Sequence, residues 1–202
     1  MKLLNAAMAS LAMLVSSAAV AAPVAQAQDS AKIVVIDQNR IMAESAGGKD
    51  IIAKVNAIET SIQNELGPIA TSLQTEGDAL DAKTANMTME AFNADTQLRA
   101  EAEAYARKAQ DFNRRRQIAQ AEFQATERVA WNTFFQAMQP VLQEVITETN
   151  ADIMIDRSDL VWAGESVDVT QSVITKMDAA LPTVNVVRQK LPTQAQQQQP
   201  QQ

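Results

Sequence analysis

Four aspartates are the first candidates for chemistry in this chain, and each lies at the end of a predicted strand or just before a predicted helix. They are Asp37, Asp152, Asp156 and Asp168. A carboxylate pair can serve as acid and base, but the sequence contains no histidine and no cysteine for a triad, thiol chemistry or the usual zinc site. Turn and cap roles suffice for aspartates at such positions. We therefore expect no enzyme, no metal site and no cofactor.

Basic side chains form a second set of candidates. Residues 99–116 are rich in cations, whereas carboxylates predominate in residues 59–81. One interpretation is charge pairing between two neighbouring helices. The other is a contact strip for anionic lipid or acidic polypeptide, attracted by local rather than net charge and centred on residues 114–116. The candidate contact residues are Arg107, Lys108, Arg114, Arg115 and Arg116.

Three apolar side chains form a third set, near a predicted helix turn. Met87, Met89 and Phe92 offer an adaptable surface for many polypeptide sequences, because methionine repacks easily. Alternatively, they close the turn by packing across it. Both interpretations place these residues at the tip of a helical hairpin.

Composition and the first residues indicate an exported acidic protein. Residues 1–27 have the pattern of a cleavable signal peptide, with a basic start at Lys2, an apolar stretch over residues 3–20 and a small-residue cleavage site at residues 25–27. The formal net charge of the chain is −7. This balance disfavours general nucleic-acid binding, so we expect an exported protein with no nucleic-acid partner.

The elements that position these candidates follow from two short strand patterns. Residues 32–37 and 151–156 are separated by 113 residues of almost uninterrupted helical pattern. Isolated strands need a sheet, so the intervening segment must leave it and return. This predicts a mainly α-helical fold in which a coiled-coil hairpin projects from a small β-containing body.

The domain boundaries depend on one proline. Pro140 should kink or break the returning helix, which would end the arm at residue 139. The arm would then span residues 46–139 with its tip at residues 81–88, and a discontinuous oligomerisation body would comprise residues 28–45 and 140–187. Residues 153–155 and 160–163 should form a β-hairpin, and Thr170 should cap the last helix. The Gln-rich residues 188–202 should be disordered. Gly67-Pro68 in the outgoing leg is either a tolerated kink or a hinge.

This layout resembles the Skp (OmpH) family of periplasmic chaperones over about residues 31–187. The resemblance rests on Lys32-Ile-Val-Val-Ile-Asp37, on Pro140 in its local sequence, on Ala151-Asp-Ile-Met-Ile-Asp156 and on the segment from Val167 to Val173. It implies a homotrimer whose arms enclose a cavity. It also implies an ATP-independent holdase that sequesters unfolded outer-membrane proteins and delivers them toward the outer membrane, with anionic lipid or lipopolysaccharide as a further partner.

The charge of the arm departs from the family pattern. Family arms are strongly basic, but residues 49–128 carry ten basic and thirteen acidic side chains. This balance favours an alternative from another class, a periplasmic scaffolding coiled coil that binds a dedicated partner. The strand motifs and the last helix favour the chaperone, since a simple spacer would not need them.

Overall fold

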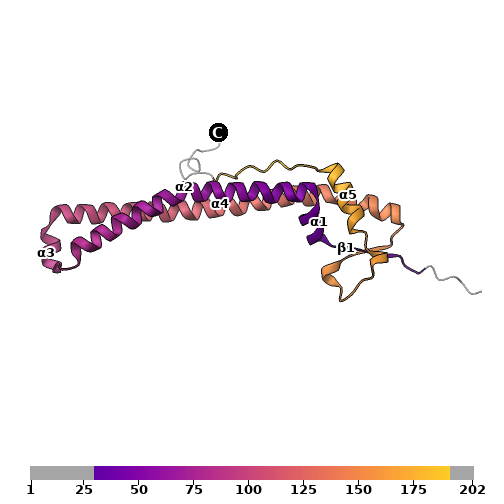
Figure 1. Ribbon diagram of the computed structural model, residues 1–202, viewed down its shortest axis with the longest axis horizontal. Helices are drawn as coiled ribbons and strands as arrows, with labels where there is room; N and C mark the ends of the chain where they lie inside the picture. Colours follow the sequence, from indigo (N-terminus) through magenta and orange to yellow (C-terminus); the bar gives the residue numbers. More distant parts are fainter. Residues whose placement is uncertain (1–29, 192–202) are drawn as a thin grey trace, which may run out of the picture. The chain divides into compact units, whose positions relative to one another are not determined.

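A computed structural model describes residues 30–191 of the chain (Figure 1). The proposed signal peptide and residues 192–202 of the predicted tail lie outside the described residues. Among the described residues, no helix is both long enough and apolar enough to cross a membrane. In chain order the elements are β1 (Ile33–Ile36), α1 (Gln38–Glu44), α2 (Ala46–Thr84), α3 (Met89–Ala94), α4 (Thr96–Thr149), β2 (Ile153–Asp156), the 3-10 helices η1 (Arg157–Asp159) and η2 (Glu165–Val167), and α5 (Thr170–Ala180).

Both predicted strands are present, and they pair with each other. β1 and β2 are parallel, with Ile33 opposite Ile153 and Ile36 opposite Asp156. Parallel strands need a long crossover, which the helices from α1 to α4 provide. Val35 also forms an isolated parallel bridge with Asp168. β1 therefore holds together segments from both ends of the described chain.

The segment between the strands forms the predicted helical hairpin. Figure 1 shows α2 and α4 side by side, with α3 at the far end of the arm. α2 contains 39 residues, which corresponds to about 58 Å at 1.5 Å per residue. It ends at Thr84, inside the predicted tip, and runs without interruption through Gly67, Pro68 and Gly77. At the tip, Thr88 caps α3 before α4 begins.

Of the two outcomes predicted at Pro140, a kink or a break, the break is wrong. α4 is one helix from Thr96 to Thr149 with Pro140 inside it. Proline removes one helical hydrogen bond, but Met138, Val141 and Val145 on either side are buried in the core, at 5%, 4% and 1% exposure. Their burial offsets the lost bond. The helix ends instead at Thr149 and is capped by Asn150, whose left-handed backbone, φ 49°, turns the following Ala151 amide back to the Ile146 carbonyl at 3.1 Å.

The core lies where the roots of α2 and α4 meet α5. Phe134, Ile51 and Met177 have no exposed surface, and Val145 is nearly as buried. The aromatic rings of Trp131, Phe134 and Phe135 cluster here. Trp131 packs edge-on against Phe134 with ring centroids 5.6 Å apart. Burial of these large side chains fixes the arm to the body.

The predicted β-hairpin after β2 does not form. The Asp156 carboxylate accepts the Ser158 amide at 2.8 Å and turns the chain into η1. Residues 160–163 form no strand beside β2, and the chain next meets the sheet at Asp168, which bridges Val35 of β1. Val161 and Trp162 are consequently exposed, at 107% and 82%.

Thr170 does not cap α5 as predicted. It is the first residue of that helix, and its fully buried hydroxyl accepts the Asp37 amide at 2.9 Å. The Asp168 carboxylate accepts the Thr170 amide at 2.8 Å and serves the helix start in its place. The position before a helix does favour threonine as a cap, but here a long-range contact uses that side chain.

The prediction that residues 188–202 are disordered is wrong for residues 188–191, which the structure describes. After α5 the chain runs back along the arm in extended form (Figure 1, yellow). Arg188 forms an ion pair with Glu122 of α4 at 2.8 Å, and its side chain is only 16% exposed. Composition suggested disorder, but these contacts with the arm order the segment.

Candidate functional site

All four candidate aspartates accept hydrogen bonds from backbone amides. Asp37 caps α1 through the Arg40 amide, and Asp156 accepts the Gln38 amide at 3.2 Å. Asp152 accepts the Lys32 amide at 2.7 Å. Burial alone would raise the pKa of Asp168, but its hydrogen bonds from Thr170 and the nearby Arg157 charge hold that pKa below its ordinary value. Within residues 30–191, no cluster of carboxylates could hold a metal ion.

The basic candidates on α4 separate onto three sides of the helix. Successive residues are rotated by about 100°, so Arg114, Arg115 and Arg116 cannot share one face. Arg107 and Arg114 are seven residues apart and share a side, as do Lys108 and Arg115. Arg116 lies on a third side. The predicted strip centred on residues 114–116 is therefore divided.

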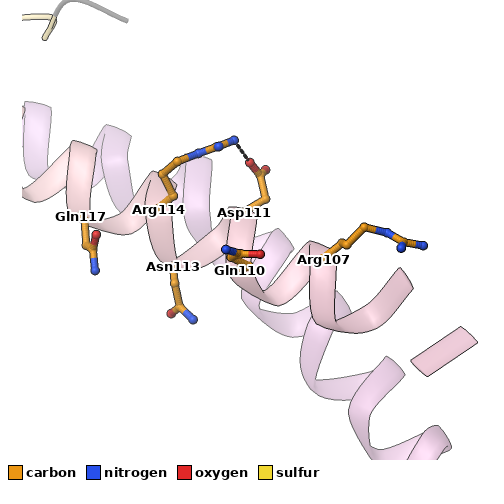
Figure 2. Close-up of a pocket in the computed structure, with 6 residues that line it drawn as sticks. All are labelled: Arg107, Gln110, Asp111, Asn113, Arg114 and Gln117. Carbon is orange, nitrogen blue, oxygen red and sulfur yellow. Dashed lines mark hydrogen bonds and ion pairs between the residues drawn. The ribbon is translucent and has the colours of Figure 1, made fainter. Parts of the chain in front are cut away.

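The side with Arg107 and Arg114 contains a shallow polar depression of about 440 Å³. Figure 2 shows Arg114 turned toward Asp111, with which it pairs, and Arg107 extended away from it. Arg107 pairs with Glu103 only at 3.5 Å, and both side chains are about 70% exposed. Amide side chains complete the lining, namely Gln110, Asn113 and Gln117. Because Asp111 also lines the depression and neutralises Arg114, it offers an anion mainly the Arg107 guanidinium and neutral amide donors.

The side with Lys108 and Arg115 faces the outgoing leg. Lys108 bridges to Glu76 of α2 at 2.8 Å, and Arg115 bonds to Asp111 at 2.7 Å. These hydrogen bonds and charges lower the pKa values of Glu76 and Asp111. Lys83 joins the legs again nearer the tip through Glu101. The charge-pairing interpretation thus holds for Lys108, while most other pairs are within α4.

Arg116 has no ion-pair partner within 4.0 Å among the described residues. It lines a groove of about 320 Å³ between α2 and α4, together with Glu59 and the apolar side chains of Ile62, Leu66 and Phe123. A second groove nearer the tip, of about 440 Å³, is lined by Pro68, Ile69, Leu73 and Phe112 among others. Both grooves combine apolar floors with charged rims, a suitable surface for weak contact with polypeptide.

The three apolar candidates at the tip differ in exposure. Met89 begins α3 and is 70% exposed, whereas Met87 and Phe92 are half-buried. Two of the three thus pack partly against the turn, and Met89 remains available to another molecule. Packing across the turn and contact with a partner are both compatible with this arrangement.

Sequence reasoning missed one charged site, at the point where the chain's last described residues meet the arm. Glu122 of α4 is only 4% exposed and is surrounded by Arg188, Lys190 and the Leu191 amide. The sequence does contain a signal for this site. Glu122 shares one helical face with Ala119 and Thr126, which are buried, and a buried charge requires a partner.

These features define a class, a mainly helical protein in which a long antiparallel hairpin projects from a small body built on two parallel strands. The family model described as "Outer membrane protein (OmpH-like)" matches residues 32–177, and the chain belongs to this OmpH-like family. It is similar to the 2.83 Å crystal structure of a candidate outer membrane chaperone (OmpH-like) from Caulobacter crescentus CB15. The TM-score is 0.67 at 26% sequence identity, over 80% of this chain and 92% of the other. Among curated proteins, none matches the chain significantly.

Proposed function

We propose that this protein is an ATP-independent periplasmic holdase chaperone. It sequesters unfolded outer-membrane proteins between helical arms and delivers them toward outer-membrane assembly. The observation that carries this proposal is the similarity, over nearly the whole length of the other chain, to an OmpH-like candidate outer membrane chaperone. The signal-peptide pattern in residues 1–27 supports the periplasmic location.

The active species is a homotrimer. Two strands of four residues make a sheet too small to be stable alone, and further chains would supply strand partners. Val161 and Trp162 present an apolar surface on the same body, next to η1 and η2. A tryptophan with 82% of its surface exposed is typical of a residue that becomes buried in an assembly. Three arms projecting from such a body would enclose a cavity.

Clients are held by many weak contacts and not by one specific pocket. The two grooves between α2 and α4 and the exposed Met89 supply adaptable apolar surface. The depression beside Arg107 and Arg114 supplies a smaller binding surface for negatively charged groups, which acidic client segments, anionic lipid or lipopolysaccharide would provide. Because the arm carries nearly equal numbers of opposite charges, apolar contacts contribute more to client binding than net attraction does.

The decisive experiment dilutes a urea-unfolded outer-membrane β-barrel protein into buffer with and without this chain. A holdase suppresses aggregation, measured by light scattering, at a ratio near one trimer per client and without ATP. Unchanged aggregation at excess chain would reject the proposal and favour the scaffolding alternative. Sizing of the purified protein should give about three times the monomer mass. A stable monomer would reject the cavity mechanism.

A further inference from the structure

The extended segment after α5 lies along the arm and bonds to both α2 and α4. We call the surface that it covers, which includes Asp50, Lys54, Glu65, Glu122 and Thr126, the groove. We call residues 182–191 the C-terminal strap. It leaves α5, passes the root of α2 and reaches the level of Glu65 and Glu122 (Figure 1, yellow). The strap lies beyond residues 32–177, where the family model matches. Its role is therefore not accounted for by the matched part of the fold.

The arm holds the strap mainly through its backbone. The Val184 amide donates to Asp50 at 2.8 Å, and the Val184 carbonyl accepts from Lys54 at 2.7 Å. Farther along, the Gln189 amide donates to the Thr126 hydroxyl at 2.8 Å. The Leu191 amide donates to Glu122 at 3.1 Å. Contacts of this kind do not depend on the strap's side chains, so another extended chain could make them.

The strap's side chains alternate between arm and solvent over its central part. Val184 is buried and Val186 packs partly against the core, whereas Asn185 and Val187 are exposed. This period of two is that of an extended strand with one apolar face. Strands of outer-membrane β-barrels have the same alternation. The strap thus presents to the arm the pattern that an unfolded barrel strand would present.

One ion-pair cluster fastens the outer end of the strap. Arg188 binds Glu122 and Glu65, both at 2.8 Å, and so joins α4 and α2. The Arg188 and Glu122 side chains are only 16% and 5% exposed. Removing one partner of a shielded pair is costly because the other charge is left without compensation. Arg188 is accordingly the residue whose substitution should release the strap.

We propose that the groove beneath the C-terminal strap is a binding site for extended polypeptide with alternating apolar side chains, and that the strap is its intramolecular competitor. Client segments displace the strap and take over its contacts with Asp50, Lys54, Thr126 and Glu122. The apparent affinity for a client is then the affinity of the open groove multiplied by the fraction of molecules in which the strap is released. The identity of the client rests on the proposed chaperone function, but the groove's preference for an extended chain does not.

The test compares two full-length variants whose substitutions change the net charge of the protein by the same amount. Arg188→Glu places a negative charge beside Glu65 and Glu122 and should release the strap. Arg128→Glu is the control, because Arg128 is exposed on α4 and has no ion-pair partner among residues 30–191. Hydrogen exchange at the amides of residues 184–191 reports release. Fluorescence anisotropy measures binding of two labelled peptides, one with the sequence of residues 182–191 and one from an outer-membrane barrel strand.

The expected result is fast exchange in Arg188→Glu and tighter binding of both peptides by about tenfold, the factor for a strap closed about nine-tenths of the time. Arg128→Glu should match the unaltered protein. Should Arg188→Glu leave the strap protected, Val184→Asp removes its buried anchor. Release in either variant without tighter binding would overturn the proposal and leave the strap a purely structural brace. A strap that stays protected in both variants would overturn it too, since a client could not displace it.

The outcome is separable from that of the chaperone proposal. If both peptides bind the released groove but barrel proteins aggregate unchanged, the groove stands and the chaperone function fails. If aggregation is suppressed equally by the unaltered protein and by Arg188→Glu, and neither peptide binds more tightly, the chaperone function stands and the strap's role fails.

Discussion

The backbone amide of Asp37 donates a 2.9 Å hydrogen bond to the Thr170 hydroxyl, across 133 residues of sequence. This bond joins the start of α1 to the start of α5, and Thr170 is fully buried. The two halves of the discontinuous body are therefore joined by a side-chain contact as well as by the pairing of β1 with β2. Removing one partner of such a buried hydrogen bond leaves the other polar group without a partner, and this loss lowers the stability of the protein.

Replacing Thr170 by valine should destabilise the protein. Valine keeps the shape but removes the acceptor, so the Asp37 amide is left unsatisfied, at a cost of about 1–3 kcal/mol in the free energy of unfolding. Urea denaturation followed by circular dichroism measures this change. Thr175→Val is the control, because Thr175 is exposed on the same helix and bonds only to its own helix at Gln171. Equal effects of the two substitutions would contradict the role given to Thr170.

Mild acid should loosen the C-terminal strap. The Lys54 ammonium and the Val184 amide lower the pKa of Asp50 from its ordinary value of 3.8. Arg188 lowers the pKa of Glu65 from its ordinary value of 4.5. Because both pKa values are lower in the folded state, this stabilisation is complete above about pH 5 and is lost as the pH falls through 4.5 and 3.8 toward the folded-state values.

Hydrogen exchange of residues 184–191 between pH 6 and pH 3, corrected for the intrinsic rate, checks this prediction. Protection should fall with pH while protection in the core around Phe134 persists. Arg188→Gln should weaken the dependence, because Glu65 then has no guanidinium partner. Constant protection of the strap down to pH 3 would contradict the prediction.

Pro68→Ala should stabilise the arm. α2 passes through Pro68, which lacks the amide needed for a helical bond, so alanine should raise the free energy of unfolding by up to about 3 kcal/mol. Gly67→Ala is the matched comparison. A side chain at position 67 meets no neighbour beyond the adjacent residues, but residues before proline disfavour the helix, so its gain should be smaller. Urea denaturation ranks the two.

The same variants decide between a hinge and a tolerated kink at Gly67-Pro68. If the pair is a hinge, Pro68→Ala should reduce suppression of client aggregation although the protein is more stable. If it is a kink, suppression should be unchanged. A Pro68→Ala variant less stable than the original protein would contradict the assignment of lost backbone bonding at this position.

The sequence predicted the hairpin and the two strands because both have regular apolar periods. It failed where tertiary contacts decide. Pro140 signals a helix end locally, but burial of Met138 and Val141 holds the helix through it. The strap was missed because nothing local in residues 188–191 indicates the distant Glu122. The basic strip was divided because consecutive arginines on a helix point in different directions.

Trp162→Ser should weaken self-association. The residue is 82% exposed on the body beside the fully exposed Val161, and a trimer interface would bury it. Its loss should shift the molecular mass measured by light scattering from about three times the monomer toward the monomer as the protein is diluted. Val129→Ser removes a 46% exposed apolar side chain from α4 and serves as the control. An unchanged mass for Trp162→Ser would place the subunit interface elsewhere.

Neutralising Arg107 and Arg114 together should weaken binding to anionic vesicles more than neutralising Arg115 and Lys108. The first pair shares the polar depression, and both side chains are about 70% exposed. Arg114 and Arg115 both pair with Asp111, so the expected difference lies in the other two residues. Arg107 approaches Glu103 only to 3.5 Å, whereas the charge of Lys108 is compensated by Glu76 at 2.8 Å. Substitution by glutamine at both positions removes the same amount of positive charge from each pair and keeps the side chains polar. Co-sedimentation with vesicles of phosphatidylglycerol should show the difference at low salt and lose it near 1 M salt, where the screening length is about 3 Å. Equal losses for the two pairs would mean that net charge, and not the depression, determines the contact.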